Sequence, residues 1–84
     1  MTRLWPEGIP IAVVCNGQGR PDRFTWRGRA HAVTLVALAW RVDLEWWRAR
    51  TWRAYYKLAT DTGLLVVVYR DLVSGDWYLQ RLYD

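Results

Sequence analysis

The stretch WRAYYKLATDTGLLVVVYRD, residues 52–71, decides the fold. Alternation in its first half divides the side chains between the two faces of a strand, with Trp52, Ala54, Tyr56 and Leu58 on one face and Arg53, Tyr55 and Lys57 on the other. The DTG that follows is typical of a tight hairpin turn. LLVVVYRD is apolar on both faces, as expected of a central strand that is covered on two sides or by a partner. We therefore predict two antiparallel strands, the second lying inside a sheet.

Further strands are predicted on both sides of this pair. SGDW turns the chain before a last strand, WYLQRLYD. Towards the N-terminus, residues 9–15 form a short apolar strand closed by NGQGRP, and the sequence RGR predicts a hairpin between residues 23–27 and a strand that begins at Arg29. The predicted fold is mainly β, with about six strands in an antiparallel meander that forms a twisted sheet or a small open barrel.

The segment RAHAVTLVALAW fits two patterns. Its apolar residues recur at helical spacing, whereas the run Val33–Val36 favours a strand. We predict a strand up to about Trp40, followed by a short helical turn or an ordered loop near residues 43–50.

Length and composition predict one small domain over residues 1–84. The apolar share is 52%, and seven Trp, five Tyr and one Phe supply large side chains for a core. The N-terminus has no long apolar region before Pro6, and no apolar run approaches the roughly 20 residues that span a bilayer. We expect a soluble, cytoplasmic protein that does not bind membranes.

Catalytic and cofactor signatures are scarce. Cys15 and His31 are the only soft metal ligands, whereas a structural zinc site needs about four. Ser74, the one serine, lies in a turn-like SGD, and no residue pair offers a nucleophile with its base. We predict no metal, no cofactor and no catalytic residue, and therefore a protein that is not an enzyme.

The positive charge is concentrated in the middle of the chain. Residues 20–53 contain eight arginines against three acidic residues, a local charge of +5. Eleven of the twelve basic residues are arginine, which binds phosphate in bidentate fashion and stacks on aromatic rings. A GC-rich genome or a thermophilic source would also favour arginine over lysine.

Two motifs resemble a known family. Phe24, Trp26, Arg27, Gly28 and Arg29 fit the pattern F-x-W-R-G-R, and the end of the chain fits Y-R-D … W-x-L-x-R-x-Y-D. Over residues 20–84 the chain resembles a small uncharacterised bacterial domain family of Actinobacteria and Thermus-like bacteria. The resemblance implies a setting in DNA repair, alone or beside Y-family DNA polymerase-like proteins of damage tolerance, and it carries no established activity.

Two functions fit these observations. The first is a non-catalytic nucleic-acid-binding module, an accessory in DNA metabolism, in which arginines contact the phosphates of a single strand and exposed aromatic rings stack on its bases. The second is a protein–protein interaction or homodimerisation module without nucleic-acid binding, because Trp, Tyr and Arg also dominate protein interfaces. Its partner would be a DNA polymerase-like protein or a second copy of the chain. For the first function, the residues predicted to contact nucleic acid are Arg23, Arg27, Arg29, Arg48, Arg50, Arg53, Trp46, Trp47 and Tyr55.

Overall fold

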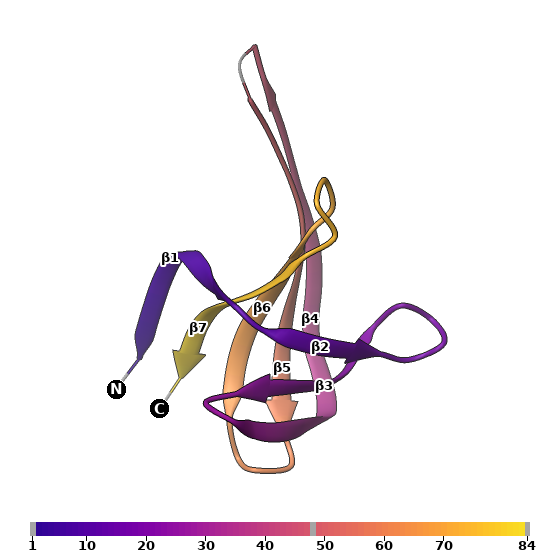
Figure 1. The fold of residues 1–84 in the computed structure, drawn as a ribbon, viewed down its shortest axis with the longest axis vertical. Helices are drawn as coiled ribbons and strands as arrows, with labels where there is room; N and C mark the ends of the chain where they lie inside the picture. The colour runs from indigo at the N-terminus through magenta and orange to yellow at the C-terminus, as the bar shows by residue number, and fades with distance from the viewer. Residues whose placement is uncertain (1, 48, 84) are drawn as a thin grey trace.

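The computed structural model describes residues 2–47 and 49–83 and contains seven β-strands in that part of the chain. They are β1 (Arg3–Pro10), β2 (Ala12–Cys15), β3 (Pro21–Trp26), β4 (Arg29–Trp46), β5 (Ala49–Thr60), β6 (Leu65–Asp71) and β7 (Trp77–Tyr83). Neighbouring strands are antiparallel in the order β1-β7-β6-β5-β4-β3-β2, and the sheet curls into a half-barrel (Figure 1). The predicted β class is confirmed, with seven strands in place of about six.

The additional strand lies near the N-terminus. The single strand predicted for residues 9–15 is in fact two, because β1 begins at Arg3 and pairs with β7, whereas β2 pairs with β3. Between them Ile11 donates its backbone N–H to the carbonyl of Trp77 at 3.1 Å. The chain thus crosses at this point from one end of the sheet to the other.

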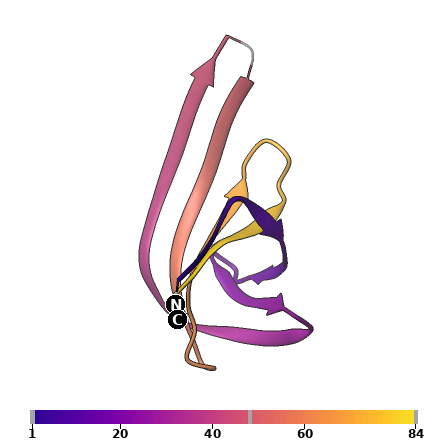
Figure 2. The same ribbon diagram turned by 90° about the vertical axis from the view of Figure 1, so that its left-hand side faces the viewer.

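The prediction of a helical turn near residues 43–50 is wrong. β4 continues to Trp46 and β5 begins at Ala49, so the two strands form a long hairpin that projects beyond the rest of the sheet (Figures 1 and 2). The sequence from residue 38 to 46 alternates as a strand does. Its even-numbered residues are Leu, Trp or Val, and its odd-numbered residues are Ala, Arg, Asp or Glu. The choice of a strand for residues 30–40 is confirmed.

The hairpin predicted before Arg29 is also confirmed. Trp26 pairs with Arg29, and the two residues between them, Arg27 and Gly28, have φ values of 52° and 73°. Two positive φ values are typical of the type I′ turn, whose twist matches that of the flanking strands. Gly28 adopts this conformation freely, whereas a non-glycine residue such as Arg27 is strained by about 1 kcal/mol.

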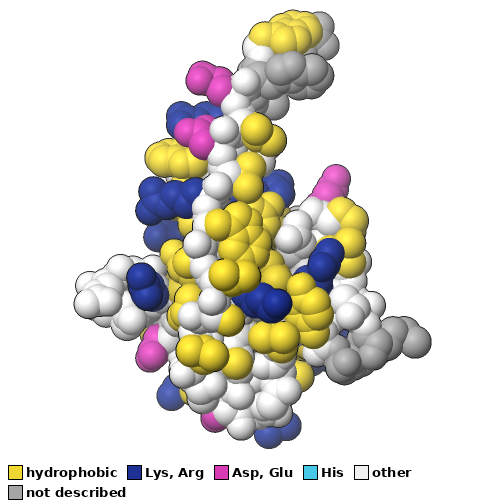
Figure 3. Space-filling model, turned by 180° about the vertical axis from the view of Figure 1, so that it is seen from behind, with side chains coloured by type: hydrophobic (Ala, Val, Ile, Leu, Met, Phe, Trp, Pro, Cys, Tyr) yellow, Lys and Arg dark blue, Asp and Glu magenta, His cyan; other side chains and the backbone are white. Residues whose placement is uncertain are grey.

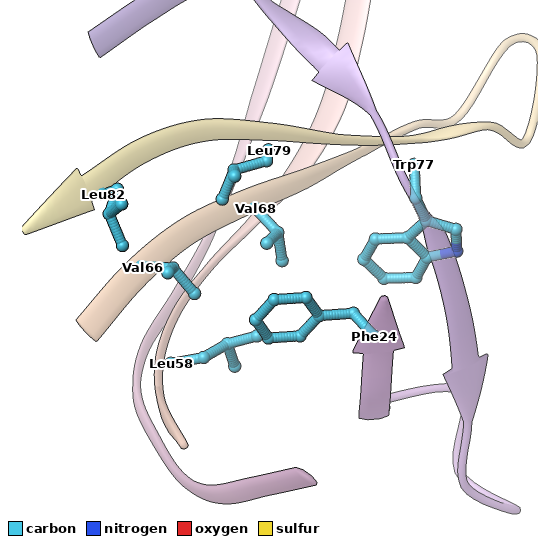
Figure 4. Close-up of a cluster of buried hydrophobic side chains, with 7 residues drawn as sticks. All are labelled: Phe24, Leu58, Val66, Val68, Trp77, Leu79 and Leu82. Atoms are coloured by element: carbon cyan, nitrogen blue, oxygen red, sulfur yellow. The ribbon is translucent and has the colours of Figure 1, made fainter. Parts of the chain in front are cut away.

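β6 is covered on both faces, as its sequence predicts. Val66 and Val68 contact one cluster of buried side chains, whereas Val67 and Tyr69 contact another. We call the side of the sheet that carries the first cluster the inner face and the opposite side the outer face. β2 and β3 fold across the inner face and bring Phe24 onto it (Figure 4). The buried side chains of this inner cluster are Phe24, Leu58, Val66, Val68, Trp77, Leu79 and Leu82.

Half-buried aromatic side chains close the inner cluster. Trp26 and Tyr56 pack against it. Trp5 of β1 meets Trp26 with ring centroids 5.5 Å apart. This contact joins β1 to β3, which are far apart in the strand order of the sheet, and it narrows the opening of the half-barrel.

Substitution of Leu58 measures how much the inner cluster contributes to the free energy of unfolding. Leu58 is fully buried, whereas Leu44 on the projecting hairpin is 64% exposed. We expect Leu58→Ala to lower the free energy of unfolding by about 2–5 kcal/mol, and Leu44→Ala to change it by less than about 0.5 kcal/mol. Urea denaturation of both variants measures the difference, and equal losses would contradict the described core.

Substitution of Gly8 probes how closely β1 packs against the tyrosines of the outer face. The φ of Gly8 is +78°, and a Cβ there would lie 2.6 Å from the Cβ of Tyr78 and 2.9 Å from a ring carbon of Tyr69. Gly63, in the β5–β6 turn, has a similar φ of +85° but open space around it. We expect Gly8→Ala to cost about 3 kcal/mol and Gly63→Ala about 1 kcal/mol, because only the first adds overpacking to backbone strain. Thermal or urea denaturation that showed equal losses would refute this packing.

Candidate nucleic-acid interface

Four aromatic side chains form a row across the outer face. Trp40 of β4, Tyr55 of β5, Tyr69 of β6 and Tyr78 of β7 occupy directly paired positions in successive strands. Their ring centroids are 5.2, 5.3 and 5.0 Å apart along the row. Directly paired residues project on the same face, so the register brings these rings together. We call these four residues the aromatic row.

Exposure changes along the aromatic row. Tyr69 and Tyr55 are only 2% and 8% exposed, whereas Trp40 is 40% exposed. The expectation that Tyr55 would be an exposed stacking side chain is wrong, because Trp40 and Tyr69 cover it from both sides. The most exposed ring of the aromatic row, and therefore the one best placed for stacking, is that of Trp40.

Three cations lie on the tyrosines of this face. The guanidinium of Arg53 is 4.4 Å from the ring centroid of Tyr69, and the Nζ of Lys57 is 5.0 Å from that of Tyr83. Arg81 lies 5.6 Å from the same Tyr83 ring. The rings thus hold the cationic groups in place while leaving the side chains half-buried. From behind, this face shows hydrophobic side chains with basic ones among them (Figure 3).

Hydrogen bonds orient two of these arginines. Arg53 donates to the hydroxyl of Tyr55 at 3.2 Å, and Arg81 donates to the hydroxyl of Tyr83 at 3.3 Å. The bond to Tyr55 is the main reason that the pKa of Arg53 lies above its ordinary value. Arg53 therefore stays charged at every physiological pH.

The hydroxyl of Tyr69 ties the row to β1. It donates a hydrogen bond of 2.7 Å to the backbone carbonyl of Glu7. Burial raises the pKa of Tyr69 above its ordinary value of 10.0, since a phenolate would be poorly solvated there, while the charge of Arg53 acts in the opposite direction.

This arrangement predicts a loss of stability at alkaline pH. Because the pKa of Tyr69 is higher in the folded state than in the unfolded one, its contribution is complete below about pH 10 and is lost as the pH rises through the folded value. Tyr69→Phe should cost about 1 kcal/mol near neutrality, from the lost bond to Glu7, but should lose less stability between pH 8 and about pH 11 than the parent chain. Urea denaturation at both pH values measures this, and parallel losses would exclude Tyr69 as the titrating group.

The structure distributes the residues predicted from sequence over three places. Arg53 lies on the outer face beside the aromatic row, and Trp47, 74% exposed, lies at the end of the β4–β5 hairpin. Arg23, Arg27 and Arg29 are exposed around the β3–β4 hairpin. Arg48 and the side chain of Trp46 lie outside the described residues.

Arg50 is engaged within the hairpin. Both its Nε and Nη2 donate to the carboxylate of Asp43 at 3.3 Å, and its guanidinium lies 4.5 Å from the ring of Trp52. The ion pair is exposed, so it contributes little to stability. The carboxylate of Asp43 nonetheless neutralises part of the charge of Arg50, so Arg50 attracts a phosphate less strongly.

Sequence reasoning missed several residues of the outer face. Trp40, Tyr69 and Tyr78 belong to three different strands, and only the register between those strands places them in a row. The one available signal was that Tyr69 lies in a strand whose two faces are both predicted to be covered. The face on which Arg81 projects depends on a register shift between β6 and β7, where Gln80 lies between the partners of Val67 and Val68.

Other chemistry is limited in the described part of the chain. His31 is buried, stacks on Phe24 and hydrogen-bonds Thr62. No group of three or more His, Cys, Asp or Glu residues that could hold a metal ion occurs among the described residues. Nor do these residues include a helix that is long and apolar enough to cross a membrane.

Comparison with known proteins places the chain in a family. It belongs to the family described as Domain of unknown function (DUF6504), whose pattern matches residues 6–84. It is similar to Protein ImuB of Caulobacter vibrioides strain NA1000 / CB15N, with 32% identity over 93 aligned residues that cover 93% of this chain and 20% of that protein. Protein ImuB of C. vibrioides strain ATCC 19089 matches with the same identity and coverage. The chain thus spans about a fifth of the length of these relatives, and no solved structure matches it significantly.

The expected membership of an uncharacterised domain family is confirmed by this match. The particular motif pattern and the bacterial groups named from the resemblance stay predictions.

Proposed function

We propose that the chain is a nucleic-acid-binding accessory module that contacts single strands through its outer face. The observation that carries this proposal is the aromatic row with Arg53, Lys57 and Arg81 held on its tyrosine rings and on Tyr83 beside it. Such a surface supplies both elements of sequence-independent single-strand binding, which are cations for phosphates and a ring for a base.

The charges of this face suit a polyanion. On β5, β6 and β7 the outer face carries Arg53, Lys57 and Arg81 against Asp71, which pairs with Arg53 in the strand register. The rings beneath Arg53 and Lys57 restrict the rotamers of these side chains before any ligand binds. The charged groups are therefore already ordered when a phosphate arrives. Preorganised side chains lose less conformational entropy on binding.

The projecting hairpin extends the same surface. Leu38, Trp40 and Leu44 are exposed on the outer side of β4, and Trp47 follows at its end. We infer that a base stacks on Trp40 and a second on Trp47, while Arg50 binds phosphate only if its contact with Asp43 is exchanged. Arg23, Arg27 and Arg29 form a separate basic patch, to which we assign a secondary role.

The cellular setting that we propose is DNA metabolism, with damage tolerance as the particular process. The similarity to Protein ImuB supports this setting, as does the implied association with Y-family polymerase-like proteins. In this view the chain supports a polymerase-like protein by holding a single strand, without chemistry of its own.

A protein-interaction module is the second candidate. The observation that favours it is the exposure of Leu35, Leu38 and Leu44, at 58%, 58% and 64%, along one strand. Apolar exposure of this kind is typical of a protein contact, whether with a polymerase-like protein or with a second copy.

The first proposal is tested by titrating intrinsic Trp fluorescence with a short single-stranded DNA at low and at physiological salt. We expect saturable quenching whose affinity falls as salt rises. Arg53→Gln combined with Lys57→Gln should weaken binding by about tenfold or more and flatten the salt slope by roughly 1.4, the value for two lost contacts to a single strand.

The matched control removes the same charge elsewhere. Arg23→Gln combined with Arg27→Gln should weaken binding much less, because these residues lie around the β3–β4 hairpin. Melting temperatures confirm that both double variants are folded. Equal weakening by the two pairs would mean general attraction without an outer-face site, and absence of quenching at either salt would overturn the proposal.

A further inference from the structure

The free edge of β4 is a feature that nucleic-acid binding does not use. β4 pairs with β3 only from Arg29 to Ala32, and beyond Ala32 the described residues place no strand on that side. From Leu38 to Trp46 the register with β5 runs without a shift, so this part of the edge is a regular strand. Unpaired N–H and C=O groups along such an edge are a template for another extended chain.

Backbone hydrogen bonds of β5 show which residues of β4 face this edge. Thr60 donates its N–H to the carbonyl of Leu64 at 3.0 Å, and the carbonyl of Trp52 accepts from Leu72 at 2.8 Å. Even-numbered residues of β5 therefore direct their backbone groups towards β6, and odd-numbered ones towards β4. The partners of the odd-numbered residues are Leu38, Trp40, Val42 and Leu44. The residues of β4 that alternate with these direct their N–H and C=O groups away from β5, and they are Ala39, Arg41, Asp43 and Glu45.

A groove of about 270 Å³ lies on the inner face beside this edge, where Ala54 and Tyr56 of β5 also line it. Its lining includes Ala39 and Arg41 from β4 and, facing them, Gln18 and Arg20 from the loop between β2 and β3. Asn16 fixes that loop, since its Oδ1 accepts from the N–H of Gln18 at 2.9 Å and from that of Arg20 at 3.1 Å. The loop therefore forms a defined second wall beside the free backbone groups.

The groove is basic on one side of the strand. Arg20 and Arg41 line it, and its lining contains no carboxylate. Within the described residues neither arginine makes an ion pair. On the other side of the strand, Leu38 and Trp40 are 58% and 40% exposed.

We propose that the edge of β4 from Leu38 to Asp43 binds an extended peptide segment of a partner protein in which acidic and apolar residues alternate. Successive side chains of an added strand point to opposite faces. Acidic side chains then meet Arg20 and Arg41, while the alternate apolar ones pack beside Leu38 and Trp40. A nucleic acid has no backbone N–H and C=O groups to complete the ladder.

The probe is a fluorescein-labelled octapeptide of alternating Glu and Val, followed by anisotropy with the full chain. We expect saturable binding by this peptide, and at least about tenfold weaker binding by two analogues. The first has Lys in place of Glu. The second carries N-methyl groups on alternate amides, so that it cannot donate to the edge.

Ala39 offers a matched pair of variants. Ala39→Pro removes an N–H that points away from β5, so the β4–β5 ladder stays intact, whereas Ala39→Ser keeps that N–H. We expect Ala39→Pro to weaken binding of the Glu-Val peptide at least about tenfold and Ala39→Ser to leave it unchanged. Arg20→Gln combined with Arg41→Gln should weaken binding of the same peptide by a similar factor, without changing the melting temperature of the protein.

Several results would overturn the proposal. Binding by Ala39→Pro as tight as that of the parent chain would exclude strand addition, and equal binding of the Glu and Lys peptides would exclude an acidic partner. A dimer in light scattering that Ala39→Pro dissociates would show that a second copy occupies the edge. Loss of single-stranded DNA binding in the Arg20, Arg41 double variant, with no peptide binding in the parent chain, would assign the groove to nucleic acid. Arg53→Gln with Lys57→Gln should retain peptide binding, which separates this inference from the proposed function.

Discussion

Burial of β6 on both faces is the constraint on which the rest of the structure depends. Val66 and Val68 lie in the inner cluster, and Val67 and Tyr69 lie in the outer one. A strand of this composition is stable in water only if both faces are covered. β2 and β3 satisfy one requirement by folding across the inner face with Phe24. The aromatic row and the cations on its rings satisfy the other.

The outer face is covered by aromatic and basic side chains instead of a second layer of backbone. Tyr55 and Tyr69 exclude water from β6, and Arg53 and Lys57 then lie over the tyrosines with their charges towards solvent. The same contacts that protect the sheet therefore produce a surface suited to anions. The same residues contribute to stability and to the proposed binding. The melting temperature of each variant therefore has to be measured beside its affinity.

β4 links the two proposed sites. Its outer-face side chains extend the aromatic row, while its outward-facing backbone groups form the free edge. The sheet leaves this edge open because β3 is short and departs after pairing with Ala32. Together the two proposals describe a small module that contacts a strand of nucleic acid on one surface and a protein segment on another.

Local patterns in the sequence determined the β class, the β5–β6–β7 meander and the turn at Arg27 and Gly28, because alternation and turn chemistry act over a few neighbouring residues. They also determined that β6 would be covered twice. The same alternation was present through residues 38–46, and a competing helical spacing obscured it. Only the tertiary structure decided the aromatic row, the burial of Tyr55 and the open edge of β4. Each of these depends on the register and length of strands distant in sequence, and a shift of one residue in pairing would move every side chain to the other face.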